Sequence, residues 1–145
     1  MKELLMHILT SIKLIEENIR IWLIFFHMPL IIIKTNVSEV NPGIKEAIHE
    51  QGQAALSSIL QKSRDYVMSL LELGQDMSFA GNSSAPCAYV EIKNVGTIKP
   101  EISLELSKEI TKILNEHLGA DPKRVYIEFQ QSERHLWGWA GKTFA

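Results

Sequence analysis

The sequence predicts an α+β domain in which two β-α-β units share one four-stranded sheet, with two helices on one face of that sheet. The first observation is a repeated order of patterns, since a strand, a helix and a strand are indicated twice along the chain. The second is spacing, because Tyr66 and Tyr126 stand at matching places in the two units and lie 60 positions apart. The third is length, since 145 residues, 46% of them hydrophobic, fit one domain. The repeat is one of structure within a single sheet, not a solenoid.

The first unit opens with a buried strand in "PLIIIKTNV", a continuous β-branched run whose proline stands where no ladder donor is needed. The segment "NPGIKEAIHEQGQAALSSILQK" predicts a helix, with Asn41 as its cap, Pro42 in its first turn and Lys62 at its C-terminus. "YVMSLLE", Tyr66 to Glu72, predicts the second strand. The apolar face of the helix consists of Ile44, Ala47, Ile48, Ala55, Leu56, Ile59 and Leu60.

The second unit follows a turn-rich connection, "AGNSSAP". "CAYVEIKNVG" predicts a strand, and "PEISLELSKEITKILNEHLG" predicts a helix from about Pro100 to Gly119, a residue suited to a left-handed helix end. "ADPKRVYIEFQ" predicts a turn and the last strand. Two helices cover one face of the sheet, yet "LIII" and "YVMSLL" are apolar on both faces. Unless the N-terminal segment covers the second face, we expect the chain to form oligomers there.

The N-terminal segment, residues 1–27, is set apart from the predicted domain at residues 28–145. It makes a poor signal peptide, because charged residues interrupt the apolar core. It makes a poor membrane span, because the clean apolar run is shorter than the ~20 residues that a bilayer needs. Three interpretations stay open: an extension outside the native product, an amphipathic helix that packs on a partner or a membrane surface, and a cleaved leader. The helical apolar stripe consists of Leu5, Ile8, Ile12, Ile15, Ile19, Trp22 and Phe26.

Composition narrows the function classes. The net charge of −2 provides no basic field to attract nucleic acid or an acidic membrane. The single cysteine, Cys87, cannot form an internal disulfide, so the fold does not depend on an oxidising compartment. The five histidines are scattered without metal-site spacing, and we predict neither a metal nor a cofactor. We expect a cytoplasmic protein that, if it leaves cells, does so by an unconventional route.

Five segments in register carry a family resemblance: "MPLIIIKTNV", "QKSRDYV", "SSAPCAYVEIKNVG", "DPKRVYIEF" and "GWAGKTFA". Together they resemble the macrophage migration inhibitory factor family of the tautomerase superfamily, over Met28 to Ala145. The resemblance implies a homotrimer whose three sheets surround a central channel, with the helices outside. It also implies keto–enol tautomerisation of aromatic α-keto acids such as phenylpyruvate, and of dopachrome-type compounds. The N-terminal segment has no counterpart in that family.

The resemblance implies two catalytic residues, Pro29 and Lys62. Pro29 matches the general base, whose secondary amine becomes free when the initiator methionine, Met28, is removed. Burial and a nearby cation both lower the pKa of such an amine from its usual ~7.7–8.0. Lys62 matches the anchor for the substrate carboxylate. The implied substrate-binding residues are Tyr66, Val95 through its backbone N–H, Tyr126 across a subunit boundary, Glu128, Trp139 and Phe144.

Each of these residues also has a purely structural interpretation. Pro29 is a strand-starting proline, Lys62 stands favourably at a helix C-terminus, and the aromatic residues suit a core or a subunit contact. The interpretations differ most at Pro29, because its nitrogen is basic only in a chain that begins there.

Several positions depart from the family pattern. Asn94 stands where serine is common, and Trp137 replaces a smaller aliphatic residue, which narrows the expected pocket mouth. Glu128 stands where animal members have asparagine, and its carboxylate would raise the Pro29 pKa or repel an acidic substrate, with Arg134 as a candidate to offset it. Val90 replaces the second cysteine of the animal CxxC motif, so no thiol–disulfide activity is expected of Cys87.

Two other functions stay beside the tautomerase hypothesis. One is a non-catalytic, cytokine-like binding or signalling protein on the same trimeric scaffold, which would act on a receptor and would not need the Pro29 amine. The other is a relative that acts on muconate-type dicarboxylates, for which only Arg134 offers a second basic anchor.

Overall fold

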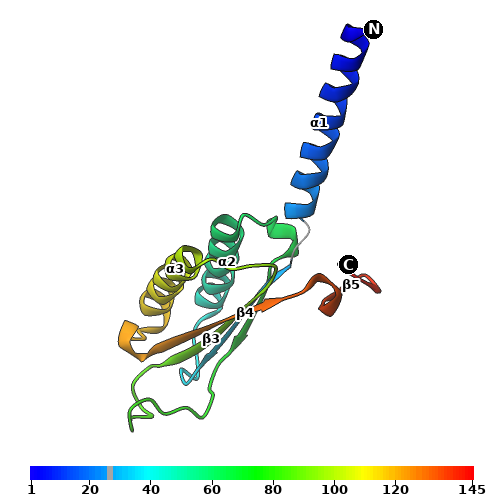
Figure 1. Ribbon diagram of the computed structural model, residues 1–145. Coiled ribbons are helices and arrows are strands. Elements are labelled where there is room, and N and C mark those ends of the chain that lie inside the picture. The colour runs from blue at the N-terminus through cyan, green and yellow to red at the C-terminus, as the bar shows by residue number, and fades with distance from the viewer. Residues whose placement is uncertain (26–27) are drawn as a thin grey trace.

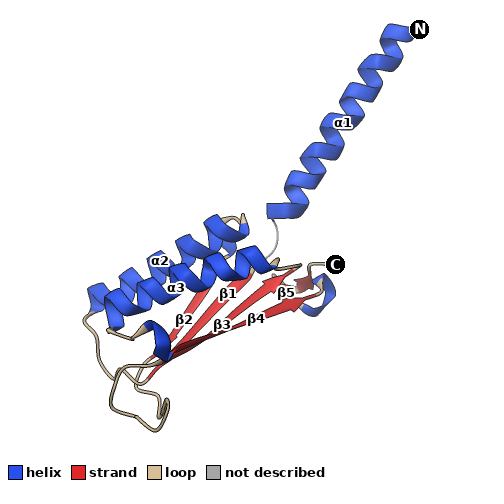
Figure 2. Ribbon diagram, turned by 60° about the vertical axis from the view of Figure 1, so that its left-hand side comes forward, coloured by secondary structure: helices blue, strands red, loops and turns tan. Residues whose placement is uncertain are grey.

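The computed structural model describes the backbone of residues 1–25 and 28–145, and the side chains of residues 1–16 and 28–145 (Figure 1). The domain is a four-stranded mixed sheet with two helices packed on one face, as predicted (Figure 2). A helix, α1 (Lys2–Phe25), precedes it. The other main elements are β1 (Pro29–Thr35), α2 (Pro42–Leu60), β2 (Met68–Glu72), β3 (Ala88–Val95), α3 (Pro100–Leu118), β4 (Val125–Ser132), β5 (Gly138–Trp139) and β6 (Lys142–Thr143).

The strand order in the sheet is β2-β1-β3-β4. Strands β1 and β2 are parallel, and so are β3 and β4, as two β-α-β units require. The two units join through the central pair, because β1 runs antiparallel to β3 with Pro29 opposite Asn94 and Thr35 opposite Ala88. The sheet therefore has one seam between the units, and that seam brings the start of the first unit to the end of β3.

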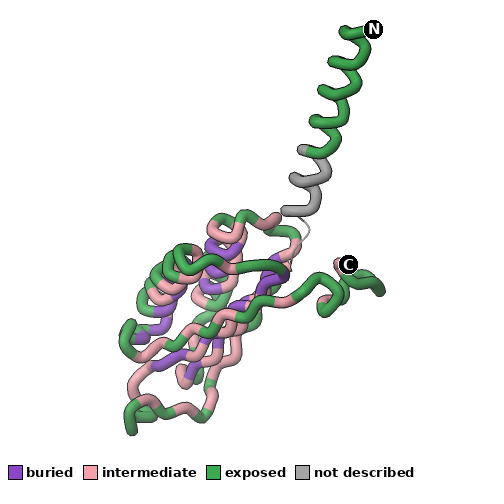
Figure 3. The backbone as a smooth tube through the Cα atoms, viewed as in Figure 1, coloured by how far each residue is buried: buried purple, intermediate pink, exposed green. Residues whose placement is uncertain are grey.

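The core lies between the sheet and the two helices, where the buried residues of Figure 3 gather. Ile31 and Val90 from the central strands and Leu56 and Leu114 from the helices are each fully buried. The predicted cap of α2 is confirmed, because the Asn41 side chain accepts a hydrogen bond from the backbone N–H of Ile44 at 2.9 Å.

Helix α3 ends as predicted. Gly119 adopts a φ of 67°, and its N–H donates to the Asn115 carbonyl. This left-handed conformation is easily reached without a Cβ, so the sequence signal and the backbone agree.

Two local features differ from the prediction. Strand β2 begins at Met68 and not at Tyr66, because Ser63 caps a 3₁₀ turn, η1 (Arg64–Tyr66), that occupies the preceding residues. The C-terminal segment was not predicted as a strand pair, yet β5 and β6 form a hairpin. Ala140 and Gly141 have φ values of 51° and 75°, the left-handed pair that a tight two-residue hairpin loop requires.

The helix α1 contributes no described side chain to the core, since residues 1–16 are all exposed. The stripe residues Leu5, Ile8, Ile12 and Ile15 are among the exposed apolar residues, whereas the predicted stripe positions 19, 22 and 26 lie outside the described side chains. Within the described residues, no helix is both long and apolar enough to cross a bilayer. Because every described core residue belongs to residues 28–145, we infer that this segment folds without α1.

The face of the sheet opposite the helices is open in the single chain and mixed in character. Over β1 and β2 it is apolar, with Ile32 half-buried beside Leu70. Over the centre it is charged, since Glu91 lies 3.5 Å from both Lys34 and Lys93. These are the two strands for which the sequence predicts apolar residues on both faces.

Arg124 ties the long connection between β2 and β3 to the start of β4. Its guanidinium donates to the backbone carbonyls of Phe79, Asn82, Ala85 and Pro86 at 2.9–3.1 Å. The guanidinium carbon also lies 5.4 Å from the centre of the Phe79 ring. One planar side chain therefore holds this connection, which lies at the end of the sheet away from the C-terminal hairpin (Figure 1).

Replacing Arg124 with Met removes every one of these donors and leaves carbonyl groups without partners. We expect a loss of about 2 kcal/mol in the free energy of unfolding, measured by urea denaturation, and faster amide hydrogen exchange in residues 79–86. Arg124→Lys keeps the charge but not the fork of donors, so it recovers only part of the loss. Lys123→Met is the matched control, and an equal loss in that variant contradicts this account.

Candidate functional site

Several chain segments meet at one edge of the sheet. Strand β1 begins there with Pro29, and β2 begins there after Tyr66 because it is parallel to β1. Strand β3 ends there with Val95 because it is antiparallel, and β4, parallel to β3, ends there before the C-terminal hairpin. The topology therefore gathers six predicted site residues at this edge: Pro29, Lys62, Tyr66, Val95, Trp139 and Phe144.

Pro29 is buried at the first position of β1. In the chain that continues from Met28, its nitrogen belongs to a tertiary amide, which has neither a hydrogen to donate nor useful basicity. In a chain that begins at Pro29, the same nitrogen is a secondary amine in a partly desolvated position. Burial favours the neutral form of that amine and so lowers its pKa.

Lys62 is held by its own backbone just after α2. The helix ends with Gln61 in the left-handed conformation, at a φ of 54°. The Lys62 N–H then donates to the Ser57 carbonyl at 2.9 Å, and the Ser57 hydroxyl donates to the Lys62 carbonyl at 2.7 Å. Burial lowers the pKa of the half-buried Lys62 ammonium, because desolvation disfavours its charged form. The sequence analysis did not identify Ser57 as a residue that holds the backbone of this lysine.

Three predicted aromatic residues form a cluster. The Tyr66 ring meets the Trp139 ring edge-on, with centroids 5.5 Å apart, and the Trp139 ring stacks nearly parallel to Phe144 at 6.5 Å. Two hydrogen bonds hold the C-terminal segment: the Phe144 N–H donates to the Trp137 carbonyl at 3.2 Å, and the Arg134 side chain donates through Nε to the Phe144 carbonyl at 2.7 Å. The cluster offers flat apolar surface to an aryl group.

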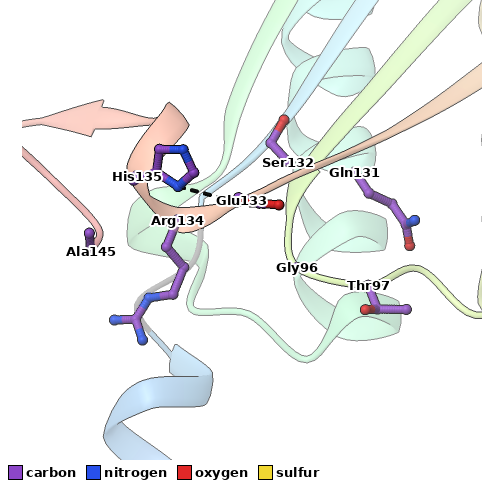
Figure 4. Close-up of a pocket in the computed structure, with 8 residues that line it drawn as sticks. All are labelled: Gly96, Thr97, Gln131, Ser132, Glu133, Arg134, His135 and Ala145. Atoms are coloured by element: carbon purple, nitrogen blue, oxygen red, sulfur yellow. Dashed lines mark ion pairs between the residues drawn. The ribbon is translucent and has the colours of Figure 1, made fainter.

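A shallow depression of about 660 Å³ lies at the same edge, between the loop after β3 and the segment after β4 (Figure 4). Gly96, Thr97 and Gln131 line one part of it, and the ion pair between His135 and Glu133, 3.3 Å apart, lies at another. Val95, immediately before it, is fully buried in the single chain. Pro29 and Lys62 do not line this depression.

Two predicted site residues, Tyr126 and Glu128, lie elsewhere in the single chain. Tyr126 is opposite Tyr89, which is opposite Lys34. Lys34 is five residues beyond Pro29 on β1, roughly 17 Å of strand. Tyr126 is 66% exposed on the open face of the sheet and touches the Phe79 ring.

Glu128 is also on the open face, where its carboxylate accepts a hydrogen bond from the Tyr89 hydroxyl. The pKa of Tyr89 is raised to about 12, first by this hydrogen bond and then by desolvation and the charge of Glu128. The expected influence of Glu128 on Pro29 therefore does not arise within one chain. The sequence analysis did not predict Tyr89 as its partner. Tyr89 is opposite Tyr126, and Glu128 is two residues beyond Tyr126 on β4, so Tyr89 and Glu128 share a face as diagonal neighbours.

Arg134 and Cys87, the other two residues singled out in the sequence, have structural contacts of their own. Arg134 donates to a backbone carbonyl, as described above, and so supports the C-terminal segment. Cys87 is buried, with 1% of its surface exposed. In the part of the chain that the structure describes, no three His, Cys, Asp or Glu side chains gather as metal ligands would.

The fold and this edge define a class of protein: a duplicated β-α-β sheet with a strand-starting proline, a lysine and an aromatic cluster at the same edge. The sequence model of the family described as macrophage migration inhibitory factor (MIF) matches residues 28–145. The macrophage migration inhibitory factor of Meriones unguiculatus is 32% identical over 120 residues, which cover 81% of this chain and 100% of that protein. The homolog from Brugia malayi is 30% identical over 117 residues, covering 81% and 99%.

Solved structures agree with this relationship. The macrophage migration inhibitory factor homologue from Prochlorococcus marinus is 34% identical, with a TM-score of 0.74 over 80% of this chain and 99% of that one. The chain therefore belongs to the macrophage migration inhibitory factor family, and through it to the tautomerase superfamily. These relatives are matched nearly end to end without α1, which supports independent folding of residues 28–145.

The bond between Tyr89 and Glu128 has a measurable consequence. Because a carboxylate accepts the phenol proton and its charge opposes ionisation, Glu128→Gln lowers the pKa of Tyr89 from about 12 towards the ordinary ~10. The measurement is tyrosinate absorbance against pH. Glu133→Gln, a carboxylate outside the sheet, is the control, and a titration of Glu128→Gln that matches the control contradicts the assignment.

Proposed function

We propose that the protein, in a form that begins at Pro29, is a keto–enol tautomerase for aromatic α-keto acids such as phenylpyruvate, and for dopachrome-like compounds. The observation that carries this proposal is the meeting of Pro29, Lys62 and the aromatic cluster at one edge of the sheet. A tautomerase needs a base near neutral pKa, a cation for the carboxylate and a surface for the ring. Membership of the family supports the same reaction class.

The reaction moves one proton and breaks no other bond. The neutral Pro29 amine takes a proton from the benzylic carbon of the keto acid, and the electron pair of that C–H bond forms the carbon–carbon double bond of an enolate. The proton then goes to the enolate oxygen, which completes the enol. A base placed for such a transfer contributes typically about 10²–10⁴-fold.

The remaining groups bind and orient the substrate. The Lys62 ammonium pairs with the carboxylate, and the partial desolvation of this half-buried cation strengthens that pairing. The substrate ring lies against Trp139 and Phe144. The backbone N–H of Val95 is the proposed donor to a substrate oxygen.

The homotrimer belongs to this proposal. Tyr126 and Glu128 lie too far from Pro29 to serve the same site in one chain, so we assign them to the site of a neighbouring subunit. The open, partly apolar face of the sheet is the surface that the trimer would cover. Glu128 would then bring a negative charge towards an acidic substrate, which slows turnover relative to an asparagine.

The start of the chain decides whether the base exists. A protein that begins at Pro29 is expected to tautomerise phenylpyruvate, whereas the chain that begins at Met1 is expected to show no activity, because its Pro29 nitrogen is an amide. The measurement is the absorbance change of the enol, after intact-mass determination of each N-terminus. Pro29→Gly in the shorter form lowers kcat, since it retains an amine but loses the ring that holds it. Equal activity of both forms rules out Pro29 as the base, and no activity in either favours a binding or signalling role.

Lys62 should govern substrate binding. Lys62→Met in the form that begins at Pro29 is expected to raise KM for phenylpyruvate by about 10- to 100-fold, the cost of losing a charged hydrogen bond. In the unmodified form, KM rises as the pH increases through the lowered Lys62 pKa, because the ammonium loses its proton. Lys45→Met, an exposed change on α2, is the control. An unchanged KM in Lys62→Met contradicts the anchor role.

A further inference from the structure

One buried polar atom at this edge has no partner. Asn94 is 2% exposed, and its Oδ1 accepts no hydrogen bond from any residue that the structure describes. Its Nδ2 donates to the Gly96 carbonyl at 3.3 Å, which fixes the amide and leaves the oxygen free. The other buried polar side chain, Thr35, is fully bonded: it donates to the Cys87 carbonyl and accepts from the Val37 N–H. A buried acceptor without a donor is costly and rare, so Asn94 needs an explanation.

The position of Asn94 in the sheet supplies an explanation for its unpartnered oxygen. It stands directly opposite Pro29 in the antiparallel pair of β1 and β3, and both residues are buried on the face that the helices cover. Directly opposed residues in such a pair have Cβ atoms about 4.5–5.5 Å apart, within reach of a short amide side chain. Pro29 is also the one residue type that has no N–H in the middle of a chain.

We propose that Asn94 is a positioning residue for the catalytic amine: its Oδ1 accepts a hydrogen bond from the Pro29 N–H that appears when the chain begins at Pro29. This inference rests on the proposed function, because only that form has the donor. The unpartnered oxygen is then the acceptor for an N–H group that the Met28–Pro29 amide lacks.

The hydrogen bond acts on the base in two ways. In the neutral amine it engages the single N–H, which turns the nitrogen lone pair away from Asn94 and limits the directions from which the amine accepts a proton. In the protonated amine it is a charge-assisted bond, which favours the charged form and raises the pKa of Pro29. Asn94 therefore opposes the effect of burial and keeps the amine closer to its ordinary pKa.

Other charged and titratable groups reach this edge from each neighbouring element. Lys62 and Tyr66 come from the segment before β2, and Glu133, Arg134 and His135 from the segment after β4. All of them stay in place when Asn94 alone is changed. A difference in the Pro29 pKa between two variants at position 94 consequently reports the amide and not its surroundings.

The test is a titration of the protein that begins at Pro29, which retains every described core residue. With ¹⁵N-labelled proline, the amine nitrogen of Pro29 is distinct from the amide nitrogens of the other four prolines, since the chain has five. We expect Asn94→Leu, which is close in size and cannot accept, to lower the Pro29 pKa by about 1 unit. Asn94→Ala is a second variant, which avoids any misfit of the larger side chain. Thr35→Val, the other buried polar position, lies about 20 Å away on β1 and should leave this pKa unchanged.

The outcomes separate the two proposals. A fall of about 0.5 unit or more in either folded variant at position 94, absent in Thr35→Val, supports the inference; a smaller fall in both overturns it. Turnover of phenylpyruvate is measured on the same samples. If the Pro29 pKa depends on Asn94 but phenylpyruvate is not turned over, the tautomerase proposal is wrong and the Asn94–Pro29 hydrogen bond stands. If phenylpyruvate is turned over but the Pro29 pKa does not depend on Asn94, the hydrogen bond is wrong and the tautomerase proposal stands.

Thermal unfolding provides a readout that does not involve the amine. In both forms, Asn94→Leu removes the hydrogen bond from Nδ2 to the Gly96 carbonyl. In the chain that begins at Pro29, the same change also removes a bonded Oδ1 acceptor, so we expect Tm to fall further in that form than in the chain that begins at Met1. An equal or smaller fall in the chain that begins at Pro29 overturns the proposed contact.

Discussion

The antiparallel pairing of β1 with β3 is the constraint on which the rest of the domain depends. It is the only contact in the described sheet that joins the two β-α-β units, and it is buried on the helix side along its length. Ile31 and Ile92, opposed across the pair, are both fully buried. A shift of one residue would turn these side chains to the open face and bring polar ones into the core, so the register has little freedom. That register places Pro29 beside Asn94 and the end of β3.

The local backbone then brings chemical groups to the same edge. A left-handed residue after α2 and a serine hydroxyl hold Lys62, and a tight C-terminal hairpin turns Trp139 and Phe144 back towards Tyr66. These local contacts involve few residues and almost none of the hydrophobic core. The site is accordingly supported by hydrogen bonds to main-chain carbonyl groups at a sheet edge, while the packing of the apolar core determines the position of that edge.

A single covalent bond governs the chemistry of Pro29. With Met28 attached, the nitrogen is an amide and the buried Oδ1 of Asn94 has no donor. Without it, the nitrogen is a secondary amine, and in the proposed contact its N–H is the donor that the oxygen lacks. On the proposed function, the same domain therefore carries either an inert strand-starting proline or a catalytic amine.

The sequence by itself determined most of the elements and the family. Asn41 as a cap, Gly119 as a helix end and Pro29 as a strand start are decided within a few neighbouring residues, which is why pattern and propensity suffice. Short-range competition explains the errors: the Ser63 cap delays β2, and β5 and β6, at two residues each, are too short to show a period.

The tertiary structure decided which of the candidate residues meet. Tyr66 and Trp139 are neighbours although they are far apart in sequence, whereas Tyr126 and Glu128 face away from Pro29. The unpartnered oxygen of Asn94 likewise cannot be read from an order of letters. Strand order and register depend on the free energy of burial between distant segments, which no local pattern contains. The sequence therefore identified the candidate residues, and only the folded sheet determined which of them lie close together.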